Sequence, residues 1–60
     1  MLKIKKYRIE KNMTQIDLAN RLCVQQSTVS QWEKGRITPP LDKLIAMSDL
    51  FGCTIDELVR

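Results

Sequence analysis

Hydrophobic residues recur at intervals of three and four along this chain, which is the spacing of one face of an α-helix. Leu18 and Leu22, for example, lie four residues apart. Similar patterns predict helices over about residues 2–11, 14–22, 25–34 and 40–51, and in a short last segment containing Leu58. No segment shows the alternation of a convincing strand. The pattern therefore predicts an all-α fold, a bundle of five helices.

The predicted starts of three helices carry residues that favour a helix N-terminus. Thr14 and Asp17 can form a shortened capping box, in which the hydroxyl accepts from an unpaired backbone N–H and the carboxylate bonds back to the backbone. Thr54 and Glu57 can form a full capping box. Pro40 is a favourable residue for the first turn of a helix.

Residues that tolerate left-handed backbone follow three of the predicted helices and predict their ends. These residues are Asn12, Gly35 and Gly52. Residues 37–40 include two prolines, which push the residues before them toward extended backbone. No helix is therefore expected to cross this segment.

The apolar positions of all five segments predict one shared core. The expected core residues are Ile4, Tyr7, Met13, Leu18, Leu22, Val24, Val29, Trp32, Leu44, Met47, Phe51, Cys53, Ile55 and Leu58. The segment after Pro40 is also expected to present a broad apolar face, made of Leu41, Leu44, Ile45, Met47, Leu50 and Phe51. Trp32 could instead stack on a DNA base, but its spacing with Val29 favours core packing.

The segment over about residues 25–34 carries amide and hydroxyl side chains on its solvent side, where a helix usually carries Lys and Glu. An amide donates and accepts at once, so Gln matches the N6 donor and N7 acceptor of adenine in the major groove. Gln26, Ser27 and Gln31 are therefore candidate base-reading residues. Together with the preceding segment and a tight break, they predict a helix-turn-helix whose second helix contacts DNA. A merely polar, solvated helix is the plainer alternative.

Basic residues are concentrated in the first part of the chain. The net charge is +3, but residues 1–36 contain eight basic and three acidic side chains, whereas residues 37–60 contain two basic and four acidic ones. A basic field of this kind suits a phosphate backbone. The length of 60 residues predicts a single domain over residues 1–60, which would bury only about 60% of its unfolded surface.

The composition does not predict an enzyme. The chain has no His, no phosphate-binding glycine loop and no plausible pair of catalytic carboxylates. Its two cysteines, Cys23 and Cys53, lie far apart and form no metal-binding or disulfide framework. No apolar stretch is long enough for a membrane span or a signal peptide. We therefore expect a cytoplasmic protein without a metal site.

The sequence resembles the Cro/repressor type of helix-turn-helix domain, the XRE family, which includes lambdoid phage repressors. The resemblance covers about residues 4–58, and it is carried by the stretches MTQIDLANRL, VQQSTVSQWEKGR, Pro39-Pro40-Leu41 and LFGCTIDEL. It implies a transcriptional regulator, most often a repressor, that binds double-stranded DNA without a cofactor. It also implies a homodimer on a palindromic operator.

The resemblance implies roles for individual residues as well. The positions that match base-reading residues are Gln26, Ser27 and Gln31. The positions that match phosphate contacts are Gln15, Thr28, Lys34 and Arg36. Gln15 also matches a family residue that braces the first base-reading Gln. Arg8 and Glu33 match a structural ion pair that ties the first helix to the end of the third.

Two positions depart from the family pattern. The family usually has Gly where this chain has Cys23, because that residue tends to be left-handed, and a non-Gly residue there costs on the order of 1–2 kcal/mol. A reactive thiol at Cys23 is the alternative interpretation, although no obvious group would stabilise its thiolate. Pro40 stands where the family often has a capping Ser, so we expect that helix to begin without a side-chain cap. Cys53 is expected to be inert packing.

A protein-interaction module with the same fold, such as an antitoxin or adaptor, is the alternative function. Ile9, Ile16 and Ile37 are apolar residues that we expect to be partly exposed, and they could contact a partner or a second copy of the chain. Salt would separate the two functions, because phosphate contacts weaken steeply with ionic strength and apolar contacts do not.

Overall fold

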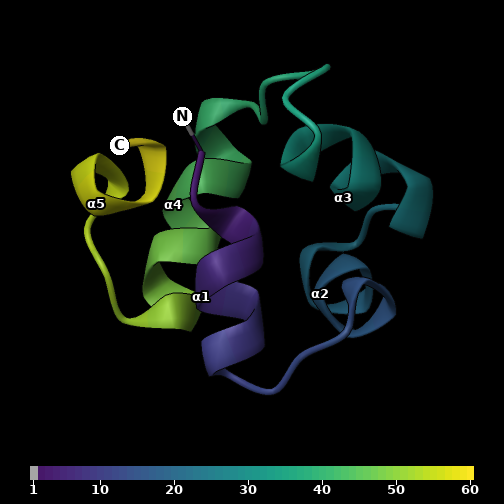
Figure 1. Cartoon of the computed structure of the whole chain (residues 1–60), viewed down its shortest axis with the longest axis horizontal. Coiled ribbons are helices and arrows are strands. Elements are labelled where there is room, and N and C mark those ends of the chain that lie inside the picture. The colour runs from purple at the N-terminus through teal and green to yellow at the C-terminus, as the bar shows by residue number, and fades with distance from the viewer. Residues whose placement is uncertain (1) are drawn as a thin grey trace.

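Five helices follow one another in residues 2–60, the part of the chain that the computed structural model describes (Figure 1). They are α1 (Ile4–Glu10), α2 (Gln15–Leu22), α3 (Gln26–Glu33), α4 (Leu41–Phe51) and α5 (Ile55–Val59). Residues 2–60 contain no strand. The predicted all-α, five-helix fold is confirmed.

The helices are arranged so that α1 and α4 lie between the other three. Figure 1 shows α2 and α3 on one side of this central pair and α5 on the other. The Tyr7 ring of α1 stacks on the Phe51 ring at the end of α4, with 6.0 Å between ring centroids. The backbone N–H of Lys3 donates to the carbonyl of Leu58, which ties the start of the chain to α5.

One apolar cluster joins all five helices. Its buried members are Ile4, Leu18, Ala19, Leu22, Val29, Trp32, Met47, Phe51 and Leu58. Trp32 is among them, so its predicted role in the core is confirmed. The remaining predicted core residues, Tyr7, Met13, Val24, Leu44, Cys53 and Ile55, are only partly buried.

The broad apolar face predicted for α4 is wrong at two positions. The structure leaves Leu41 65% exposed and Ile45 46% exposed. The reason is helix geometry, since a step of about 100° per residue places Ile45 nearly opposite Met47 on the helix. Met47 and Phe51 face the core, so Leu41 and Ile45 form an outward stripe one turn apart.

The predicted helix boundaries have their expected local causes. The capping boxes of Thr14 with Asp17 and of Thr54 with Glu57 are both formed. Pro40 precedes α4 without a side-chain cap, as expected. The four residues with left-handed backbone include the three that were predicted at helix ends and the turn residue; they are Asn12, Cys23, Gly35 and Gly52.

A contact from α4 completes the end of α2. Lys43 Nζ donates to the carbonyl of Leu22 at 2.8 Å. A cation is favourable there because the last carbonyl groups of a helix lack partners within it and carry partial negative charge.

None of the helices in residues 2–60 has the length and apolar character needed to cross a bilayer.

Candidate nucleic-acid interface

The solvent face of α3 follows from the two residues that α3 buries. Val29 and Trp32 face the core, so at about 100° per residue Ser27 and Lys34 lie on the opposite side of the helix. Gln26 and Gln31 lie at the two edges of that outward face. Ser27 and Gln26 are exposed at the start of α3, whereas Gln31 is partly buried one turn further along.

The start of α3 lacks the side-chain cap that the starts of α2 and α5 have. Gln25 is the N-cap residue, but its side chain caps no backbone N–H, and the first turn of α3 contains no acidic residue. The first backbone N–H groups of a helix carry partial positive charge and favour anions. Thr28, which is partly buried, lies in this same first turn. The start of α3 therefore combines exposed amide and hydroxyl groups with a backbone end suited to phosphate.

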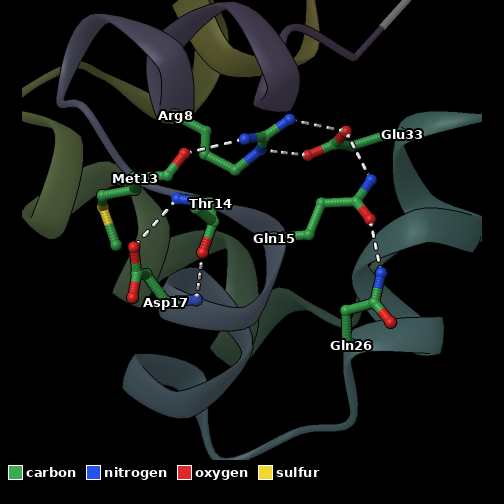
Figure 2. A network of polar contacts seen from close by, with 7 residues as sticks. All are labelled: Arg8, Met13, Thr14, Gln15, Asp17, Gln26 and Glu33. Carbon is green, nitrogen blue, oxygen red and sulfur yellow. Dashed lines mark hydrogen bonds and ion pairs between the residues drawn. The ribbon is translucent and has the colours of Figure 1, made fainter.

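Gln15 connects the starts of α2 and α3. It is the first residue of α2, and its side-chain Oε1 accepts a hydrogen bond of 2.8 Å from Gln26 Nε2. Its Nε2 donates to Glu33 Oε1 at 3.0 Å, so one amide contacts both ends of α3 (Figure 2). The expected bracing of Gln26 by Gln15 is therefore present in the structure.

Arg8 and Glu33 form the expected ion pair behind this contact. Arg8 Nε lies 2.7 Å from Glu33 Oε2, and Arg8 Nη2 donates to Glu33 Oε1 at 3.3 Å. The two side chains are only 11% and 5% exposed. Arg8 Nη1 also donates to the carbonyl of Met13 at 2.7 Å, which ties the loop before α2 to the same guanidinium.

These contacts make one continuous series from the interior to the surface, seen across Figure 2. We call it the polar chain; its members are Arg8, Glu33, Gln15 and Gln26. It joins α1, both ends of α3 and the start of α2. Because every member is hydrogen-bonded to the next, the exposed amide of Gln26 is held by a buried charge pair.

The positive charge of the first 36 residues is divided between two sides of the molecule. Lys34 and Arg36 are exposed at the end of α3, and neither forms an ion pair within residues 2–60. Lys3 and Lys6, however, lie close enough to α5 to act on Glu57. The Thr54 backbone and hydroxyl hold the pKa of Glu57 below its ordinary value, and these two lysines lower that pKa further. The count of charges along the sequence therefore overstates the positive charge beside α3.

The structure brings together some of the predicted site residues and separates others. Gln15 and Gln26 are in direct contact, as are Arg8 and Glu33. The rest of the predicted site residues lie along α3 and the loop after it, and within residues 2–60 their side chains form no hydrogen bond or ion pair with one another; they are Ser27, Thr28, Gln31, Lys34 and Arg36. The backbone N–H of Arg36 donates to the carbonyl of Gln31 at 3.0 Å, which ties this loop to α3.

Two contacts of the site were not predicted from the sequence. The ion pair and the contact of the two glutamines were predicted separately, but the bond from Gln15 to Glu33 that joins them was not. The bond from Arg8 to the Met13 carbonyl was not predicted either. The first of these links residues 18 positions apart in the sequence, so no local spacing indicates it.

Comparisons with known proteins agree with this geometry. A helix-turn-helix family model matches residues 4–58. An uncharacterised HTH-type transcriptional regulator of Methanocaldococcus jannaschii is 38% identical over 56 residues, which are 93% of this chain and 85% of that protein. The HTH-type transcriptional activator BcrR of Enterococcus faecalis is 40% identical over 57 residues, 95% of this chain, although the chain spans only 28% of that relative's length.

A solved structure shares the fold. The P22 c2 repressor protein, determined in complex with a synthetic operator, superposes with a TM-score of 0.88. The two sequences are 28% identical, and the match covers 97% of this chain and 88% of the repressor chain.

Proposed function

The chain belongs to the helix-turn-helix family of Cro/repressor (XRE) type, and we propose that it regulates transcription by binding a double-stranded DNA operator with α3 in the major groove. The observation that carries the proposal is the exposed Gln26 at the uncapped start of α3, held in place by Gln15. A side chain that is both exposed and held loses little conformational freedom when it binds.

Base recognition is assigned to the outward side of α3. Gln26 and Gln31 each offer a donor and an acceptor, which match adenine in the major groove. Ser27 lies between them and can bond to a base edge or to a phosphate. The N-terminal part of a recognition helix is the part that normally contacts base edges, and Gln26 and Ser27 occupy that part here.

Phosphate contacts are assigned to residues around the two ends of α3. Lys34 and Arg36 supply positive charge beyond its C-terminus, and Gln15 and Thr28 supply neutral donors near the helix starts. These contacts would position the protein on the duplex without selecting a sequence. Each cation that neutralises a phosphate would contribute about −0.9 to the slope of log affinity against log salt concentration.

We further propose that the chain acts as a homodimer on a palindromic operator in the cytoplasm. One recognition helix of this size contacts only a half-site, and two half-sites in successive major grooves lie about 34 Å apart. The proposed effect is repression by occupancy of the operator. BcrR is an activator and P22 c2 is a repressor, so relatives with this domain act in both directions.

The experiment is a selection of bound sequences from a random pool of double-stranded DNA, at two salt concentrations. A palindromic consensus that binds more weakly at the higher salt concentration is expected. Gln26→Ala is expected to lose discrimination at one or two base pairs, by about 1–3 kcal/mol for a bidentate contact. Lys34→Met is the matched control, since it should weaken binding to every sequence alike and reduce the salt slope by about 0.9.

The outward apolar residues support a second candidate, a module that binds another protein. Ile37, Leu41 and Ile45 are all exposed, and the last two lie one turn apart on α4. If the selection enriches no DNA sequence even at low salt, this candidate replaces DNA binding. An equal loss of affinity for consensus and random DNA in the Gln26→Ala variant would contradict the assignment of Gln26 to base recognition.

A further inference from the structure

The polar chain begins with two groups whose hydrogen-bonding capacity is fixed. The Arg8 guanidinium only donates, and the ionised Glu33 carboxylate only accepts. Glu33 accepts from Arg8 Nε through Oε2 and from Gln15 Nε2 through Oε1. Because the carboxylate has no hydrogen to give, Gln15 has to turn the nitrogen of its amide toward Glu33.

The orientation of the Gln15 amide fixes that of Gln26. With its nitrogen toward Glu33, Gln15 turns its oxygen toward Gln26, and that oxygen accepts from Gln26 Nε2 (Figure 2). Gln26 then offers its other Nε2 hydrogen and its Oε1 to a further partner. Gln15 likewise offers its second Nε2 hydrogen, which suits an anionic phosphate oxygen.

We propose that Glu33 determines base specificity at the pair contacted by Gln26, although its own side chain is buried. The proposal rests on the proposed contact of Gln26 with DNA. A glutamine amide matches the N7 acceptor and N6 donor of adenine in only one of its two orientations. Glu33 selects that orientation through Gln15, so it is a positioning residue for the amides of both Gln15 and Gln26.

The substitution Glu33→Gln is expected to reverse which amide group donates and which accepts in each hydrogen bond of the polar chain beyond position 33. Arg8 donates to both Glu33 oxygens, and its Nε contact at 2.7 Å is shorter than its Nη2 contact at 3.3 Å. The shorter contact is expected to keep the oxygen of the new amide, so the amide nitrogen would turn toward Gln15. Gln15 would then present its oxygen to position 33 and its nitrogen to Gln26, which would accept through Oε1. The order of donor and acceptor facing the groove would be reversed, and the preference for adenine at that base pair is expected to fall at least about fivefold.

The test measures the affinity of the full chain for operators that differ only at the base pair contacted by Gln26. The wild-type protein is compared with Glu33→Gln and with the double variant Gln15→Glu/Glu33→Gln. In the double variant the carboxylate stands at position 15 and accepts from both neighbouring amides, so Gln26 again donates. It is expected to recover the adenine preference while binding all sequences more weakly, because a carboxylate repels phosphate.

A second comparison separates this role from general stability. In the Gln26→Ala background, Glu33→Gln should cause no further change at that base pair. Circular dichroism shows whether Glu33→Gln folds. If it does not, the base preference of Gln15→Met is measured instead, because this variant keeps the buried ion pair and interrupts only the middle of the polar chain. Gln15→Met is expected to lower the adenine preference, whereas the control Lys34→Met should lower affinity without changing it.

Several outcomes would overturn the proposal. They are an unchanged base preference in Glu33→Gln or in Gln15→Met, a double variant that does not recover the preference, and an effect of Glu33→Gln that persists without Gln26. A wild-type consensus that depends on Gln26 but not on Glu33 would overturn this proposal alone. Failure of the wild-type protein to select any sequence would overturn the proposed function with it.

Discussion

The turn between α2 and α3 and the turn between α4 and α5 have the same backbone and different side chains. Each helix ends in a left-handed residue, Cys23 at φ 57° and ψ 42° and Gly52 at φ 70° and ψ 31°. The next residue in each turn donates its N–H to the carbonyl five positions back. The following helix then starts from an extended N-cap residue, Gln25 at φ −82° and ψ 152° or Thr54 at φ −82° and ψ 159°.

The two turns differ at the positions where side chains control stability. The α4–α5 turn has Gly at the left-handed position and a capping Thr, which are the residues that such a turn favours. The α2–α3 turn has Cys and Gln instead, and α3 has no side-chain cap. We therefore expect the α2–α3 turn to be locally less stable than the α4–α5 turn. Reduced local stability is common at functional sites, and this turn precedes the helix proposed to contact DNA.

The largest expected effect comes from the buried ion pair that ties α1 to the end of α3, the helix that follows the first turn. Arg8→Met would leave the buried Glu33 carboxylate without its charge partner and is expected to destabilise the protein by about 3–5 kcal/mol. Urea unfolding of the two proteins measures the difference. The double variant Arg8→Met/Glu33→Leu is the control, because two apolar residues can replace a buried ion pair at little cost. A loss below about 1 kcal/mol for Arg8→Met would mean that the pair behaves as an exposed one.

Exchanging the left-handed residues should bring the two turns closer in stability. Gly52→Ala is expected to cost about 1–2 kcal/mol through backbone conformation alone, since a Cβ at this position meets no atom within 4 Å. Cys23→Gly is expected to keep or raise the melting temperature, with a gain of up to about 1 kcal/mol. Thermal unfolding of both variants provides the measurement. A clear drop in the melting temperature of Cys23→Gly would contradict the cost assigned to a left-handed Cys at this position.

A cap added to α3 should make the first turn resemble the second more fully. Gln25→Thr would place a hydroxyl where it can accept from a backbone N–H of the first turn, and it is expected to stabilise the protein by about 1 kcal/mol. Binding to the consensus operator should keep its base preference, because Gln25 lies outside the proposed base contacts. Unfolding curves together with the operator series check both halves of this expectation.

The smallest expected effect is a difference in acid sensitivity. The Thr14 backbone N–H and hydroxyl hold the pKa of Asp17 below its ordinary value of 3.8, and those of Thr54 hold the pKa of Glu57 below 4.5. The folded state therefore binds these protons less tightly than the unfolded state. The stabilisation is present above those ordinary values and is lost as pH falls through the lower folded ones.

Stability measured against pH in wild-type, Asp17→Asn and Glu57→Gln tests this expectation, because each amide keeps an oxygen to accept from the Thr backbone but has no proton to bind in this pH range. Each substitution is expected to reduce the loss of stability in acid. Gln25→Thr should not change that loss, because it adds no carboxylate to α3. Identical acid profiles for wild-type and both amide variants would contradict the assignment.

Much of the fold was predictable because the helix boundaries depend on residues that are close together in the sequence. The capping boxes, the left-handed positions and the buried spacing of Val29 with Trp32 all involve residues within a few positions of one another. The outward stripe of Leu41 and Ile45 was not predicted, because an apolar side chain near a core and one facing solvent look alike in sequence. The rotation of α4 against its neighbours decides between them.

The candidate site was likewise predictable only in part. Residue types and helix period were enough to indicate the candidates for DNA recognition, the amide and hydroxyl side chains of α3. The bond of Gln15 to Glu33, the contact of Lys43 with the end of α2, and the position of Lys3 and Lys6 beside α5 depend on tertiary packing. These contacts join residues far apart in the chain, and their geometry exists only after the helices have packed around the shared core.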